Sequence, residues 1–190
     1  DSLTGSGFAD VILGGEGNDT IPITAGNDSL DGQDGTDLIV ATGETDYTLS
    51  DTQLASSSTD SLTSIEQADL TAGIGDNTID ASTFSGSTTL QGESGDDTIT
   101  GGTGNDLIMG GAGDDVLDGA AGDDNIFGSS GQDTLTGSLG DDAIFGESDD
   151  DTLVETADVD LTLTDSTMTG LGTDSISGIG SALLTGGASP

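Results

Sequence analysis

The sequence predicts an all-β protein built from short strands stacked as coils, a β-solenoid, and two observations support this. First, a nine-residue repeat runs through much of the 190-residue chain, with Gly favoured at positions one, two and four. Second, only 31% of the residues are hydrophobic and 3% are aromatic. This hydrophobic content is low for a globular core, but it suits a narrow interior filled by one aliphatic residue per repeat. Each repeat has room for a strand of about three residues, and such a strand needs stacked neighbours.

The repeats fall into two blocks with a constant register. The longer block covers residues 92–154 and contains seven nonapeptides, while an earlier block covers residues 1–40. Glycine at positions one, two and four predicts backbone with positive φ in a six-residue turn. Position eight is always Ile or Leu and is predicted to point inward. Position six is always Asp, namely Asp10, Asp19, Asp28, Asp37, Asp97, Asp106, Asp115, Asp124, Asp133, Asp142 and Asp151.

Three of the nonapeptides, GGEGNDTIP, GGTGNDLIM and GGAGDDVLD, match the pattern G-G-x-G-x-D-x-U-x at every specified position, where U is aliphatic. In this the sequence resembles the RTX (repeats-in-toxin) family of calcium-binding proteins. The resemblance implies a right-handed parallel β-roll in which two nonapeptides form one turn of the coil. It also implies export of the unfolded chain by type I secretion.

Two nonapeptides per turn would stack the position-six residues into one ladder along each edge of the roll, about 4.8 Å apart. Two bare carboxylates at that distance repel by roughly 3 kcal/mol at an effective dielectric constant near 20. A divalent cation bound between them makes the electrostatic energy of the group favourable. Oxygen ligands suit Ca²⁺ better than Mg²⁺, and zinc would lack nitrogen or sulfur. We therefore predict Ca²⁺ bound by the position-six Asp residues and by Asn77, which occupies position six of a partial repeat. The alternative, a solvated acidic linker, does not explain why position six is always Asp and position eight always Ile or Leu.

Two segments interrupt the period. Residues 41–91 are predicted to form an irregular β-solenoid insert that ends in a partial repeat, and residues 155–190 a second copy of it. Residues 48–71 align with 162–185 at an offset of 114 residues, so we expect a tandem array of modules of that length. Ser and Thr alternating with apolar residues favour irregular β coils, although a helix within 60–70 is an alternative. Residues 81–91 are predicted to form a strand, a loop and a strand.

The composition of charged residues argues against several classes of function. The chain has 37 acidic residues but no Lys, Arg, His or Cys, which disfavours nucleic acid, nucleotides and anionic membranes as partners. An imidazole base, a thiolate and a disulfide are excluded. A carboxylate-pair glycosidase is disfavoured because no Trp and one Tyr leave little for a sugar to stack on. No apolar run is long enough to predict a membrane span.

We therefore expect a non-enzymatic structural protein, extracellular or at the cell surface, that folds on binding Ca²⁺. It would be a segment of a long scaffold such as an adhesin, S-layer or filament protein, associating with itself end to end or laterally. Met109, Phe127 and Phe145, at position nine and eighteen apart, are the candidate lateral contact. The main alternative is a calcium-dependent folding and secretion module attached to a catalytic domain. Ice binding is disfavoured, because it would need a regular array of Thr and Asn along the roll. Only GGTGNDLIM has Thr at position three together with Asn at position five.

Overall fold

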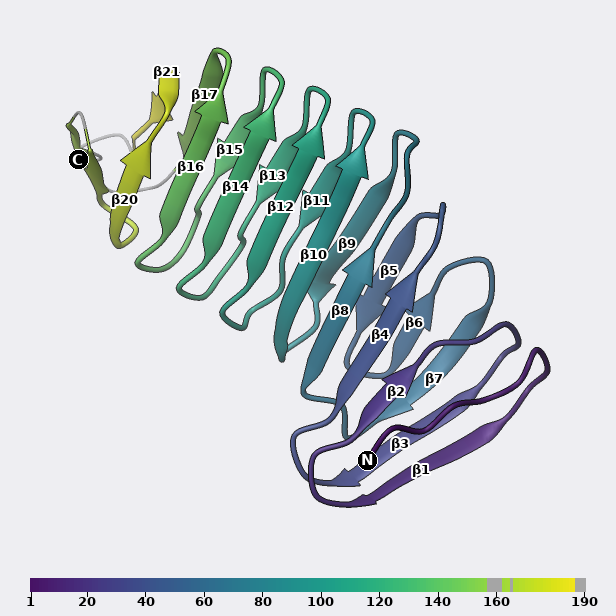
Figure 1. Ribbon diagram of the computed structural model, residues 1–190. Helices are drawn as coiled ribbons and strands as arrows, with labels where there is room; N and C mark the ends of the chain where they lie inside the picture. Colours follow the sequence, from purple (N-terminus) through teal and green to yellow (C-terminus); the bar gives the residue numbers. More distant parts are fainter. Residues whose placement is uncertain (157–161, 165, 187–190) are drawn as a thin grey trace.

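The computed structural model describes residues 1–156, 162–164 and 166–186, and it shows two facing β-sheets between which the chain alternates (Figure 1). The described residues form strands, turns and bends without any helix, so none of them provides a helix able to cross a membrane. Position-eight side chains such as Ile108, Leu117 and Ile126 fill the space between the sheets and are fully buried. The predicted all-β roll with an aliphatic interior is therefore confirmed.

One sheet has eleven strands and the other has ten. In spatial order, the eleven-stranded sheet contains β1 (Val11–Glu16), β3 (Ser29–Asp34), β7 (Thr59–Thr63), β6 (Gln53–Ala55), β5 (Tyr47–Ser50), β9 (Thr78–Thr83), β11 (Thr98–Thr100), β13 (Val116–Asp118), β15 (Thr134–Thr136), β17 (Asp151–Thr156) and β21 (Ile179–Thr185). The ten-stranded sheet contains β18 (Thr162–Leu163), β19 (Thr167–Thr169), β20 (Thr173–Ser177), β16 (Ala143–Ser148), β14 (Asn125–Ser130), β12 (Leu107–Ala112), β10 (Ser87–Ser94), β8 (Gln67–Thr71), β4 (Leu38–Thr42) and β2 (Thr20–Pro22).

Parallel pairing within the repeat blocks joins residues that are eighteen apart in the sequence. In the ten-stranded sheet Ile108 pairs with Ile126 and Ile126 with Ile144, and in the eleven-stranded sheet Leu117 pairs with Leu135. Two nonapeptides therefore form one coil, as predicted. Each inward side chain stacks on an equivalent one in the next coil, so the interior is a continuous aliphatic column.

The glycines do not all serve the purpose that the sequence suggested. Positive φ occurs at position two, where Ala120 (φ 70°) and Ser129 (φ 82°) adopt it without being Gly, and at position four, as in Gly113 (φ 136°). Position-one glycines such as Gly119 do not have positive φ. Glycine is required there for close approach instead, because a Cβ atom on Gly119 would collide with the Asp124 carboxylate of the same turn.

The insert at 41–91 forms strands throughout, so the alternative of a helix within 60–70 is wrong. Strands β5, β6 and β7 form an antiparallel meander, while β8 lies in the opposite sheet between β4 and β10. Residues 81–91 follow the predicted plan, because β9 and β10 flank a short loop that carries the fully buried Phe84.

The meander makes the two sheets unequal in length. Between β3 and β9 the eleven-stranded sheet contains three strands, whereas between β4 and β10 the ten-stranded sheet contains only β8. Neighbouring strands are about 4.8 Å apart, so one side of the roll is about 10 Å longer over this stretch. The axis of the roll accordingly changes direction at this level (Figure 1).

The second insert repeats the meander in the other sheet. Strands β19 and β20 begin and end 114 residues after β6 and β7, and they show the same antiparallel pairing. However, β7 joins β3 in the eleven-stranded sheet, whereas β20 joins β16 in the ten-stranded sheet. The repeat seen in the sequence is therefore also a structural repeat, with its meander on the opposite side.

Candidate metal centre

Position-six side chains are held one above another by hydrogen bonds along each edge of the roll. On one edge the backbone N–H of Asp97 donates to Asp115 Oδ1 at 2.8 Å, and that of Asp115 donates to Asp133 Oδ1 at 2.9 Å. The opposite edge repeats the arrangement from Asp106 through Asp124. These carboxylates are at most 2% exposed. The backbone thus fixes one oxygen of each carboxylate and turns the other into the turn of its own repeat.

The other oxygen, Oδ2, is buried without a hydrogen-bond partner in the described part of the chain. This applies to Asp37, Asp60, Asp97, Asp115, Asp124, Asp133, Asp142 and Asp151. Leaving a buried carboxylate oxygen unpaired is strongly unfavourable, and this chain has no Lys, Arg or His side chain to pair with it. The partner that these oxygens require is therefore a cation from outside the chain.

The turns offer a second oxygen close to each of these carboxylates. Beside Gly119, the position where a Cβ atom would stand is filled by Asp124 Oδ2 and lies 3.0 Å from the carbonyl oxygen of Gly137 in the next coil. Gly92, Gly110 and Gly128 are flanked by the same two kinds of oxygen. A carboxylate and carbonyls that converge from neighbouring turns form a hard oxygen donor set, which fits Ca²⁺.

Each site would use few carboxylates. Among the described residues, no three Asp, Glu, His or Cys side chains form a group that could hold a metal ion. A cation in a turn would therefore take one or two carboxylates and complete its shell with backbone carbonyls.

Some of the predicted residues differ from the rest in their hydrogen bonds. Asp10 Oδ2 accepts the backbone N–H and the hydroxyl of Ser6, which lowers the pKa of Asp10. Asp106 Oδ2 accepts the N–H of Gly102 at 2.7 Å. Asn77 lies at the end of a ladder, where its N–H donates to Asp97 Oδ1 at 2.7 Å. The structure thus places all three in the ladders, but with fewer unpaired oxygens.

Three acidic residues that the sequence analysis did not include extend the ladders into the inserts. The N–H of Asp28 donates to Asp60 Oδ1 and that of Asp142 to Asp174 Oδ1, each across 32 residues, and the N–H of Asp37 donates to Glu66 Oε2. Asp60 and Asp174 precede Leu62 and Ile176 by two residues, as position six precedes position eight. This D-x-U signal, shared by both inserts, would have identified Asp60 and Asp174.

A second, exposed ladder at position five was also missed. Asp96 Oδ1 accepts the N–H of Asp114 at 2.9 Å, and Asp114 Oδ1 accepts the N–H of Gln132 at 2.8 Å. On the other edge, Asp123 Oδ1 accepts the N–H of Asp141. Position-five side chains thus hold the following coil, whereas position-six side chains hold the preceding one. Each turn is fixed from both directions.

Burial raises the pKa of Asp115 and Asp124 to about 7 and that of Asp142 to about 6, with neighbouring carboxylates adding to the effect. These folded-state values lie above the ordinary value of 3.8. Protonation therefore favours the calcium-free fold. The stabilisation is complete below about pH 3.8 and is lost as the pH rises through the folded-state pKa values.

In excess chelator, we expect acidification from pH 8 to pH 4 to increase the β-sheet signal in circular dichroism. Calcium binding should show the opposite dependence, because protons compete for the same oxygens. A chelated chain whose spectrum is the same at pH 8 and pH 4 would contradict this prediction.

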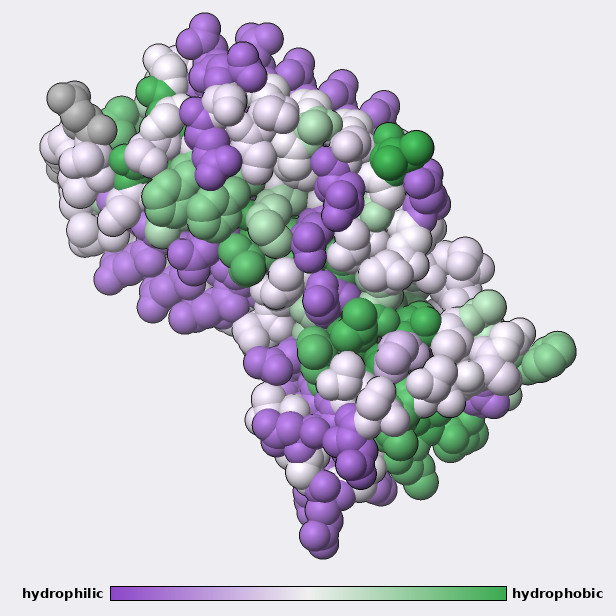
Figure 2. Space-filling view, viewed as in Figure 1, coloured by the Kyte–Doolittle hydropathy of each residue, from purple (hydrophilic) through white to green (hydrophobic). Residues whose placement is uncertain are grey.

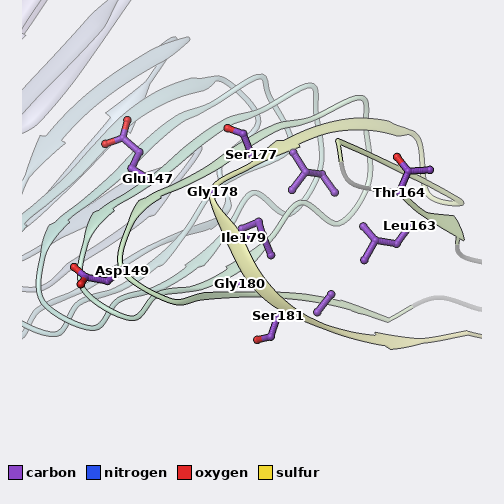
Figure 3. Close-up of a pocket in the computed structure, with 11 residues that line it drawn as sticks. Glu147, Asp149, Leu163, Thr164, Ser177, Gly178, Ile179, Gly180 and Ser181 are labelled. Carbon is purple, nitrogen blue, oxygen red and sulfur yellow. The ribbon is translucent and has the colours of Figure 1, made fainter.

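A pocket of about 550 Å³ lies at the C-terminal end of the roll, with Glu147 and Asp149 at one side and Leu163 and Thr164 at the other (Figure 3). Both carboxylates are exposed to solvent. They have no buried, unpaired oxygen of the kind found in the ladders. The candidate metal sites are therefore the turns and not this pocket.

Parallel coils, position-one glycines and buried carboxylate ladders define a calcium-binding β-roll. The family model of the RTX calcium-binding nonapeptide repeat matches four stretches, residues 1–21, 24–47, 82–117 and 118–153. The chain therefore belongs to the RTX calcium-binding repeat family, and Ca²⁺ is its metal.

No curated protein matches the chain. Among solved structures, the crystal structure of the extracellular lipase LipA from Serratia marcescens is similar over 95% of this chain, with 19% identity and a TM-score of 0.24. The aligned part spans 38% of the lipase chain.

Proposed function

We propose that this chain is a secreted structural roll that folds when Ca²⁺ binds along its two edges. The observation that carries the proposal is the series of buried, unpaired Oδ2 atoms in a chain with a net charge of −37 and no basic side chain. The ligands would be the position-six residues, from Asp10 to Asp151, together with the turn carbonyls beside them. Calcium would then be part of the core and its binding energy part of the folding energy.

An extracellular location follows from the same requirement. Sites of this kind in extracellular modules bind Ca²⁺ with dissociation constants of about 10⁻⁴ to 10⁻³ M. In such a range the chain would be unfolded inside a cell and would fold once outside. This order of events suits type I export of an unfolded chain, the route typical of RTX proteins.

A scaffold role, as in an adhesin, S-layer or filament, is supported by the modular architecture. The same meander recurs after 114 residues, and every described strand belongs to one of two continuous sheets. We assign the roll itself no catalytic role, because its buried carboxylates are committed to the ladders.

The outer face of the ten-stranded sheet offers a lateral contact between copies of the chain. Met109 pairs with Phe127 and Phe127 with Phe145, and the two phenyl rings stack with centroids 4.9 Å apart and planes at 12°. All three side chains are half-buried. Figure 2 shows an apolar area on this face, bordered by hydrophilic residues. Burying it against a second copy would remove apolar surface from water.

We expect the wild type to self-associate in millimolar calcium and a Phe127→Ser, Phe145→Ser variant to be mainly monomeric. Sedimentation velocity measures the difference at calcium concentrations where both are folded. The matched control is Thr100→Ser, Thr136→Ser, which changes position nine in the other sheet and should associate like the wild type. If the wild type and the Phe variant are equally monomeric, the scaffold contact is not on this face.

A further inference from the structure

Glu155 stands where the repeat would have a glycine. Position one is Gly in all seven repeats of residues 92–154, and the next position one, eighteen residues after Gly137, is Glu155. Its side chain is only 1% exposed although it ends in an ionisable carboxyl group. A buried carboxylate in this column therefore needs a specific reason.

One oxygen of Glu155 replaces a backbone acceptor. In the two preceding coils on this edge, the N–H of Gly101 donates to the carbonyl of Asp118 and that of Gly119 to the carbonyl of Thr136. The N–H of Gly137 instead donates to Glu155 Oε1 at 2.6 Å, and Ser138 N–H donates to the same atom at 3.2 Å. These two bonds fix the carboxylate over the turn of residues 137–142.

The other oxygen, Oε2, is buried and has no hydrogen-bond partner among the described residues. The same turn carries Asp142, whose Oδ2 is likewise buried and unpaired and lies 2.5 Å from where a Cβ atom on Gly137 would stand. Beside Gly119 the next coil supplies a glycine carbonyl at the equivalent point, but no carbonyl is among the three atoms nearest to this point on Gly137. The turn thus has two unpaired carboxylate oxygens, and no carbonyl oxygen lies as close to this point as the Gly137 carbonyl, at 3.0 Å, lies to the equivalent point on Gly119.

The first module shows the arrangement without the acid. The residue 114 positions before Glu155 is Ala41, which is buried at 3% exposure. There the N–H of Ile23, the counterpart of Gly137, donates to the carbonyl of Val40 at 2.8 Å, the regular backbone bond. A buried Glu is therefore not required for the roll to pass into its insert, and its presence in the second module calls for a separate function.

We propose that Glu155 and Asp142 together hold a divalent cation at the turn of residues 137–142, with the Glu155 side chain supplying the oxygen that a glycine carbonyl supplies in regular turns. Two carboxylates would neutralise one divalent ion, and their oxygen-only donor set favours Ca²⁺. The inference rests on the proposed calcium-dependent folding. It adds a ligand from outside the nonapeptide pattern to the turn of Asp142, next to Asp174, whose Oδ1 accepts the N–H of Asp142 at 3.1 Å.

Native mass spectrometry of the calcium-loaded chain tests this by counting bound Ca²⁺ ions in Glu155→Gln and Glu155→Ala. The Gln variant keeps an oxygen acceptor for Gly137 and Ser138 but loses the charge, and the Ala variant restores the residue that the first module uses. The matched control is Glu44→Gln, the same change at an exposed carboxylate. We expect both Glu155 variants to bind one Ca²⁺ fewer than the wild type, and the control to bind the same number.

A Glu155 variant that folds in excess calcium and binds as many Ca²⁺ ions as the wild type overturns the assignment and leaves Glu155 as a hydrogen-bond acceptor only. Circular dichroism identifies which variants fold, and the Ala variant keeps the test decisive if the Gln variant does not. Failure of the proposed function would look different, because the wild type itself would then bind no calcium.

Discussion

Removal of calcium is expected to abolish the β-sheet spectrum of this protein at neutral pH. Without the cation, the buried Oδ2 atoms of the ladders would remain unpaired in a chain of net charge −37, and each nonapeptide contributes only one position-eight aliphatic side chain to the interior. Repulsion of roughly 3 kcal/mol between neighbouring ionised rungs, summed along both ladders, exceeds the 5–15 kcal/mol by which domains are normally stable. Circular dichroism during titration with a calcium chelator measures the effect.

The chain should refold when calcium is returned, with a midpoint in the range of about 10⁻⁴ to 10⁻³ M. Magnesium at the same concentration serves as the control and should restore little structure, because it requires a near-ideal octahedral shell. A β-sheet spectrum that survives excess chelator at neutral pH would show that the ladders are stable without metal.

The second large effect is expected from Asp124→Asn. Asp124 lies at the centre of its ladder, where its Oδ1 accepts the N–H of Asp106 and its own N–H donates to Asp142 Oδ1, so the substitution removes the charged ligand of the turn that its unpaired Oδ2 faces. Asn retains an oxygen acceptor for the N–H of Asp106 and differs mainly in charge. Loss of an interaction with a charged group costs about 1.5–3 kcal/mol, so we expect the calcium midpoint to rise roughly tenfold or more.

Asp123→Asn is the matched control, because the same change is made one residue away in the exposed position-five ladder. Its calcium midpoint should remain close to that of the wild type. The two variants are compared by calcium titrations followed by circular dichroism. Equal midpoints for Asp123→Asn and Asp124→Asn would contradict the assignment of the metal to the inner ladder.

The roll could be predicted from the sequence because its geometry repeats with the sequence. A constant register of nine residues fixes which residues point inward, and two repeats per coil fix which residues stack, as Ile108 and Ile126 do. Position six could be assigned to the edges for the same reason. No long-range contact had to be known.

The remaining features depend on contacts that the period does not encode. Asp60 and Asp174 join the ladders across 32 residues, because an antiparallel meander brings the chain back to the coil that it left. The position-five ladder was missed because that position varies among Asp, Asn and Gln in the pattern. The position-one glycines were assigned to backbone conformation, whereas their role becomes visible only once the Asp carboxylate is seen beside them.

The placement of the two meanders sets the path of the molecule as a whole. The first lengthens the eleven-stranded sheet and the second lengthens the ten-stranded sheet, so a roll that continued beyond the second meander would be deflected there in the opposite sense. If both lay in one sheet, successive deflections would add and a chain of such modules would curl toward a ring. In a tandem array with the sides alternating, the deflections would cancel in pairs and the modules would follow a zigzag whose mean direction is straight, so that reach would grow in proportion to the number of modules.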